Sequence, residues 1–252
     1  MLDSTGTATR HSEGDVGTAS PEKVSAPSGA AVYAGHCAVC HGSDGRGQGE
    51  AAHRLTVKPR NFVKAEYRFR STASGKLPTD GDLRRAIVNG LPGTAMVPQN
   101  QLSATEVAAV IDYVKSLSPR FTEEPAAQPL RLPAPVPRTA TSLQHGREVF
   151  LDAGCDGCHG DRGKGDGRNA ADLSMAPTNL TRHPLKGGST ASDILRSVVT
   201  GLNGTPMPSY DLLYDPEEMW ALAYYVESLG VRGGLTEQAR LGWKIEKRTP
   251  PD

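Results

Sequence analysis

Two copies of one five-residue pattern, Cys-x-x-Cys-His, constrain this sequence more than any other feature. The copies span residues 37–41 and 155–159, and together they contain all four cysteines of the 252-residue chain. Cysteines at this spacing occur in redox disulfides and in halves of zinc sites, but the immediate histidine favours covalent attachment of haem. The two thiols bond to the vinyl groups of one porphyrin, and the histidine ligates its iron. We therefore predict two haem c groups, attached through Cys37, Cys40, Cys155 and Cys158 and ligated by His41 and His159.

The two halves of the chain are similar well beyond these motifs. Glycines follow each histidine at matching positions, and Pro59 recurs as Pro177 at the same offset of 118 residues. Later in the chain the offset falls to 111, so the first half has about seven additional residues between Phe62 and Ile87. This pattern indicates a duplication, which predicts two similar domains with one haem in each.

Composition divides the chain into five parts. Residues 1–28 are small and polar and are predicted to form a disordered leader, and residues 231–252 form a polar tail. The first domain is predicted over residues 29–121 and the second over residues 142–230. Between them, residues 122–141 contain five prolines and no helical period, which is typical of an extended, semi-rigid linker.

Helical patterns predict an all-α fold, since no alternating strand pattern occurs in the sequence. Each domain should contain a short helix before its motif (29–35 and 142–153), a middle helix (80–89 and 191–200) and a closing helix. A capping box from Ser103 to Glu106 begins the first closing helix. An aspartate cap followed by Pro216 begins the second. The buried face of that helix is predicted to comprise Met219, Trp220, Ala223, Tyr224 and Val226.

In this order of elements, each half resembles a class I cytochrome c domain. The order is helix, Cys-x-x-Cys-His, glycine loop, proline, middle helix, methionine loop and closing helix, and it covers about 180 residues. The tandem arrangement is similar to di-haem cytochromes of the cytochrome c4 kind. The segment 67–72 and the long prolyl linker are not typical of that group. They look more like the di-haem electron-transfer subunits of larger respiratory oxidoreductases.

The resemblance implies a methionine as the sixth ligand of each iron. Met207 follows Gly204-Thr205 and directly precedes a proline, and Met96 lies in the corresponding loop with one extra residue before its proline. The resemblance also implies that Pro59 and Pro177 each offer a carbonyl to the free imidazole N–H of the iron-ligating histidine. From their shared spacing, Asn61 and Asn179 are expected near the haem propionates, together with Arg60.

An iron with two protein ligands has no free position for a substrate, so we expect an electron relay between redox partner proteins. The partner would be a larger oxidoreductase or a respiratory complex. The alternatives are a di-haem enzyme of the peroxidase or thiosulfate-oxidising type, with one open iron, and a subunit whose role is mainly structural. Net charge is zero, which argues against nucleic-acid binding.

The two predicted domains carry opposite net charge. Lysine and arginine outnumber aspartate and glutamate by 12 to 7 in residues 29–121, whereas the acidic residues lead by 12 to 7 in residues 142–230. Two docking partners of opposite charge would account for this difference.

No apolar stretch is long enough to span a membrane. Because haem c is attached outside the cytoplasm, we expect a periplasmic location or the outer face of a membrane, with an export signal or anchor upstream of this chain.

Overall fold

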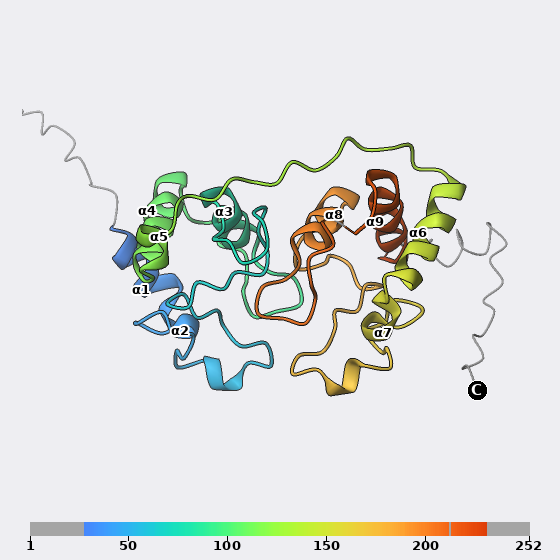
Figure 1. Cartoon of the computed structure of the whole chain (residues 1–252). Helices are drawn as coiled ribbons and strands as arrows, with labels where there is room; N and C mark the ends of the chain where they lie inside the picture. The colour runs from blue at the N-terminus through green and yellow to red at the C-terminus, as the bar shows by residue number, and fades with distance from the viewer. Residues whose placement is uncertain (1–27, 212, 231–252) are drawn as a thin grey trace, which may run out of the picture.

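The computed structural model describes residues 28–211 and 213–230, and over these ranges the chain forms helices and no β-strand. The first domain contains α1 (Gly29–His36), α2 (Ala38–His41), η1 (Ala52–Arg54), α3 (Asp80–Asn89), α4 (Ala104–Ser116) and α5 (Arg120–Glu123). The second contains α6 (Ala140–Asp152), α7 (Cys155–His159), η2 (Ala170–Asp172), α8 (Ala191–Thr200) and α9 (Pro216–Gly230). Figure 1 shows the two helical domains next to each other, joined by an extended segment. The predicted all-α fold is confirmed.

Local capping sets the ends of the helices. Thr79 caps α3 and Thr190 caps α8, each by accepting a hydrogen bond from the backbone N–H three residues later. The capping box at Ser103 is present at the start of α4. Helix α6 begins two residues earlier than predicted, at Ala140, because the side chain of Thr139 caps it. The predicted leader and tail lie outside the described residues, except that Ser28 caps α1.

In each domain the helix before the motif crosses the closing helix at a glycine, α1 with α4 and α6 with α9. A Cβ atom on Gly29 would lie 2.0 Å from the carbonyl oxygen of Ala109 in α4. In the second domain, a Cβ atom on Gly146 would lie 1.9 Å from the carbonyl oxygen of Ala221 in α9. Only glycine allows such close contact between helix backbones, so these two positions fix the helix pair that supports each Cys-x-x-Cys-His segment.

The linker is bound to the second domain along part of its length. The predicted buried face of α9 is confirmed, but every residue from Met219 to Val226 is buried, which requires cover on all sides. Leu130, Leu132 and Val136 of the linker provide part of it by packing against the second core. Trp220 Nε1 donates to the carbonyl of Pro133 at 3.1 Å, and the Tyr224 hydroxyl donates to the carbonyl of Val136 at 2.7 Å.

The segment 65–79, which lies within the region of additional residues, joins the two domains. Arg70 is 1% exposed, and its guanidinium donates to the carbonyls of Thr200 at 2.7 Å and Gly201 at 3.2 Å in the second domain. A second contact runs from the backbone N–H of Gly75 to Asn203 Oδ1 at 3.1 Å. We call these contacts the domain joint. They bring the end of α8, where the second methionine loop begins, against the first domain.

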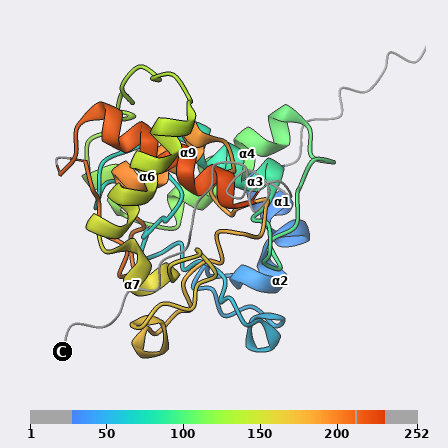
Figure 2. The same ribbon diagram turned by 90° about the vertical axis from the view of Figure 1, so that its right-hand side faces the viewer.

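The segments containing η1 and η2 lie on the same side of the molecule, opposite the linker, in both Figure 1 and Figure 2. Each is the next helical element after the Cys-x-x-Cys-His helix of its domain. None of the described helices is long and apolar enough to cross a membrane.

Candidate haem sites

One short helical turn positions the attachment residues in each domain. Helix α1 ends before Cys37, and the new helix α2 places Cys40 and His41 one turn further along. Gly154, in the left-handed conformation at φ 68°, makes the corresponding break before α7. Residues three apart on a helix lie on one face. The two cysteines of each pair therefore face the same cavity.

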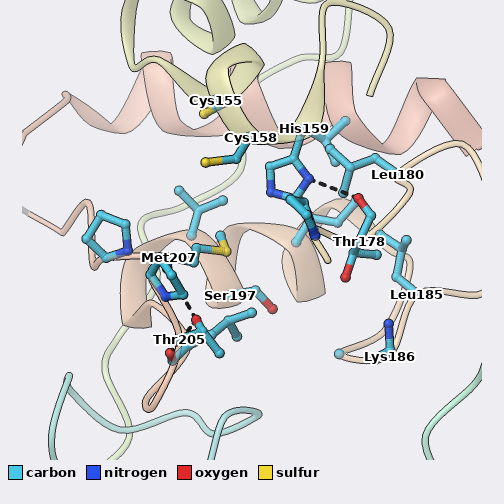
Figure 3. Close-up of a pocket in the computed structure, with 18 of the residues that line it drawn as sticks. Cys155, Cys158, His159, Thr178, Leu180, Leu185, Lys186, Ser197, Thr205 and Met207 are labelled. Carbon is cyan, nitrogen blue, oxygen red and sulfur yellow. Dashed lines mark hydrogen bonds between the residues drawn. The ribbon is translucent and has the colours of Figure 1, made fainter. Parts of the chain in front are cut away.

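Each domain has one cavity on which the predicted ligands converge. Cys37, Cys40, His41 and Met96 line the cavity of the first domain. Cys155, Cys158, His159 and Met207 line that of the second, where Figure 3 shows the side chains of Cys158, His159 and Met207 directed into one space. The remaining walls are largely apolar, with Leu83, Ile87 and Val110 in the first domain and Ile194, Val198 and Leu222 in the second.

Both methionine loops have the same internal hydrogen bonds. In the first, Thr94 Oγ1 accepts from the N–H of Met96 at 3.1 Å and donates to the carbonyl of Leu91 at 2.7 Å. Thr205 makes the same two bonds around Met207, at 3.2 and 2.7 Å. The extra residue between Met96 and its proline therefore does not alter the loop. This role of Thr94 and Thr205 was not predicted from the sequence, although both occur in the Gly-Thr-x-Met pattern that could have indicated it.

The imidazole of each motif histidine is held by a backbone carbonyl, but not by the one predicted. His41 Nδ1 lies 3.0 Å from the carbonyl oxygen of Arg60, and His159 Nδ1 lies 2.9 Å from that of Thr178. The prediction of Pro59 and Pro177 as the acceptors was wrong by one residue. Successive carbonyls of an extended segment point in opposite directions, and the proline carbonyls face the glycine loop, close to Gly47 and Gly165. Both prolines still line their cavities.

Asn61 and Asn179 occupy local turns. Asn61 Oδ1 accepts from the N–H of Lys64 at 3.1 Å, and Asn179 Oδ1 accepts from the N–H and hydroxyl of Thr181 at 2.9 and 2.7 Å. Neither asparagine is among the residues that line the cavities, whereas Arg60 is. The shared spacing of the asparagines thus reflects side-chain turns that both domains need, and their predicted contact with the haem finds no support in these contacts.

Burial sets the protonation of the attachment residues. It lowers the pKa of His41 and His159, which favours the neutral imidazole that ligates a metal. It raises the pKa of the Cys37 thiol to about 11 and that of Cys155 to about 12. Redox-active cysteine pairs have lowered thiol pKa values instead, so these pairs do not have the electrostatics of a dithiol catalyst.

The zinc alternative has no geometric support. Within the described ranges, no three histidine, cysteine, aspartate or glutamate side chains are placed so that they could hold one metal ion. The two cysteine pairs belong to different domains. By contrast, two thiols, an imidazole and a thioether around one largely apolar cavity fit the attachment and axial ligation of a haem c.

Comparisons with known proteins agree with this chemistry. The family model described as Cytochrome c matches residues 26–118 and 143–230. The Cbb3-type cytochrome c oxidase subunit CcoP of Azospirillum brasilense is 27% identical over 203 residues, which cover 80% of this chain and 61% of that protein. The subunit FixP of Azorhizobium caulinodans is 27% identical over 202 residues, with 80% and 59% covered. The chain thus spans about three fifths of the length of these curated relatives.

A match to one solved structure covers nearly the full length of the solved chain. One chain of the Kuenenia stuttgartiensis reducing HAO-like protein complex superposes with a TM-score of 0.77 and 36% sequence identity. The match covers 80% of this chain and 94% of that chain. The similarity therefore includes both domains and their relative placement.

Proposed function

Since this chain belongs to the cytochrome c family, with one family domain in each half, we propose that it relays single electrons between partner proteins through two covalently bound haem c groups. One observation carries the proposal. In both domains a histidine and a methionine line the same cavity as the cysteine pair, so each iron can take two protein ligands. Two protein ligands to one iron would leave no position for a substrate, which favours electron transfer over catalysis.

The haem, when bound, supplies the one-electron couple of its iron. The chain holds and tunes this group with its own residues. The carbonyls of Arg60 and Thr178 accept the imidazole N–H, which fixes the orientation of His41 and His159 and makes each a stronger ligand. The apolar walls would shield most of the haem from water, and a thioether ligand favours a comparatively positive potential.

We further propose that the partners are components of a larger oxidoreductase. Two relatives are named as subunits of a cbb3-type cytochrome c oxidase, and the similar solved chain belongs to a reducing HAO-like protein complex. The carrier role would place electron donor and acceptor on different domains. A location outside the cytoplasm follows from the site of haem c attachment.

The first prediction concerns stoichiometry and turnover. A pyridine haemochrome assay should give two haems per chain that acidified solvent does not extract, and a reductive titration should consume two electrons per chain. The reduced protein should be reoxidised by ferricyanide and show no turnover of peroxide or thiosulfate above background. One haem per chain would contradict the proposal, and sustained peroxide or thiosulfate turnover would favour the enzyme alternative.

The second prediction concerns the basic first domain. Val39 and Val97 line its cavity and are 54% and 59% exposed, so this cavity opens to solvent. Lys58 is also exposed and lines the same cavity. Oxidation of the first haem by the anion ferricyanide should slow as salt is added, because salt screens the attraction. Lys58→Glu should slow this reaction several-fold in stopped-flow experiments at low salt.

Lys64→Glu is the matched control, because Lys64 is exposed in the same domain and does not line the cavity. The second domain has the opposite net charge, so its reaction with ferricyanide should not slow as salt is added. Rates that do not depend on salt, or equal effects of the two substitutions, would show that the charge difference between the domains has no role in docking.

A further inference from the structure

Three cationic side chains gather where the two cavities adjoin. Arg60 and Arg68 of the first domain line the first cavity, and Lys186 of the second domain lines both cavities. Phe69 also lines both, so the cavities share a wall. Burial, followed by the charge of Arg68, lowers the pKa of Lys186 and lowers that of Arg60 to about 10. Because the charge of Arg68 acts on both groups, the three cations lie close together. We call Arg60, Arg68 and Lys186 the interdomain cations.

The charge of Glu66 balances the interdomain cations only in part. Among the residues that the structure describes, none of the three forms an ion pair with a carboxylate, although the charge of Glu66 favours the cationic form of Arg60 and Arg68. The Nε atom of Arg68 is buried without a hydrogen-bond partner. Like charges gathered in a partly buried place are unfavourable unless an anion joins them.

A buried hydroxyl in the same cavity also lacks a partner. Tyr67 is 8% exposed and lines the first cavity, and its hydroxyl makes no hydrogen bond within the described part of the chain. Burial raises the pKa of Tyr67, so the hydroxyl keeps its proton and can donate. Buried polar groups without a partner are rare in native proteins. Together with Arg68 Nε, this hydroxyl indicates an acceptor inside the cavity.

The chemistry of the haem supplies such an acceptor. A haem has two propionate carboxylates at the edge of the ring away from the vinyl groups that the cysteines attach. Figure 3 shows Lys186 well away from Cys155 and Cys158. The side of the cavity that can receive the propionates is therefore the side where Lys186 lies.

We propose that Arg60, Arg68, Lys186 and the Tyr67 hydroxyl bind the haem propionates where the two cavities adjoin, with Lys186 serving the haems of both domains. This inference rests on the proposed haem sites and adds a binding site that neither domain contains alone. The second domain contributes a cation to the first cavity, and the first contributes Phe69 to the second. Both haems would then depend on one shared positive charge.

The test compares three charge-removing substitutions in the full chain. Arg68→Gln should lower the reduction potential of the first haem alone, because Arg68 lines only that cavity and its charge favours the ferrous state. Lys186→Gln should lower both potentials, by up to a tenfold change in the equilibrium constant of each one-electron reduction, which is 59 mV. Lys164→Gln, an exposed lysine of the second domain that lines neither cavity, should change neither.

The potentials are measured by spectroelectrochemistry, and the haem-methyl NMR signals of the oxidised protein report which haem is affected. Lys186→Arg should keep both potentials near those of the unmodified protein, which separates charge from disturbed folding. Equal effects of Lys186→Gln and Lys164→Gln, or an effect on the second haem alone, would overturn the inference. A shift that appears only in phosphate buffer would assign the cations to a free anion. A haem count other than two would instead contradict the proposed function.

Discussion

Replacement of Met207 by alanine should let the reduced protein bind carbon monoxide rapidly at the second haem, where the unmodified protein binds it poorly. Met207 lines the second cavity together with His159, and Thr205 holds its loop in place. Without the thioether the iron has an open position. Its potential should fall by on the order of 0.1 V or more, since axial ligands span about 0.8 V across haem proteins. Met96→Ala should have the same effect at the first haem.

The chain offers a matched control within the same cavity. Met175 also lines the second cavity, but it is 37% exposed and has no counterpart in the first domain. Met175→Ala should therefore leave carbon monoxide binding and both potentials unchanged. Flash photolysis gives the binding rates, and spectroelectrochemistry gives the potentials. Rapid carbon monoxide binding by the unmodified protein would mean that one iron lacks its methionine, and the enzyme alternative would then account better for the chain.

Replacement of Arg70 by methionine should release the two domains from each other. The substitution keeps much of the side-chain volume but removes the donors to the carbonyls of Thr200 and Gly201. The carbonyl of Gly201 keeps a second donor, the hydroxyl of Thr200 at 3.1 Å, whereas the carbonyl of Thr200 loses the guanidinium. A buried carbonyl without a donor costs about 1–3 kcal/mol, so the joint should lose roughly that amount. We expect denaturant unfolding to separate into two transitions, and the radius of gyration in small-angle scattering to increase. Because Gly201 begins the methionine loop, the second haem should also lose part of its sixth ligation.

Arg84→Met serves as the control for the loss of one positive charge from the first domain, because Arg84 is exposed on α3 and takes no part in the joint. Asn203→Ala removes the other contact of the joint, a single exposed hydrogen bond with Gly75. It should cost less than Arg70→Met. A single unfolding transition at unchanged denaturant concentration in the Arg70 variant would show that the joint contributes little to holding the domains together.

The sequence predicted those features that depend on neighbours a few residues apart. The middle helices have the predicted bounds because Thr79 and Thr190 cap them and glycine follows each. The side-chain types required to attach and ligate a haem could also be predicted, since Cys-x-x-Cys-His is a local pattern. Each of these features results from an interaction within one turn of helix, which the order of residues specifies directly.

Contacts between distant segments could not be predicted in this way. The bonds of Arg70 reach residues 130 and 131 positions away. Their only trace in the sequence is the longer segment in the first domain. The choice of Arg60 rather than Pro59 as the imidazole acceptor depends on which way one carbonyl points, and composition carries no information on that rotation. The attachment of the linker to Trp220 and Tyr224 likewise required the two cores to be placed first.

The attachment of the linker makes the two duplicated domains unequal, because the second domain needs residues from outside its own helices to complete its core. Residues 130–136 complete the core of the second domain and seal one side of α9, while the carbonyl of Ser71 holds the linker at Leu130 with a hydrogen bond of 2.8 Å. The complete structural unit of the second domain therefore begins in the linker, before α6. A recombination event that exchanged the second domain from the start of α6 would leave the linker-facing side of α9 uncovered. An exchange that began before residue 130 would transfer a complete domain.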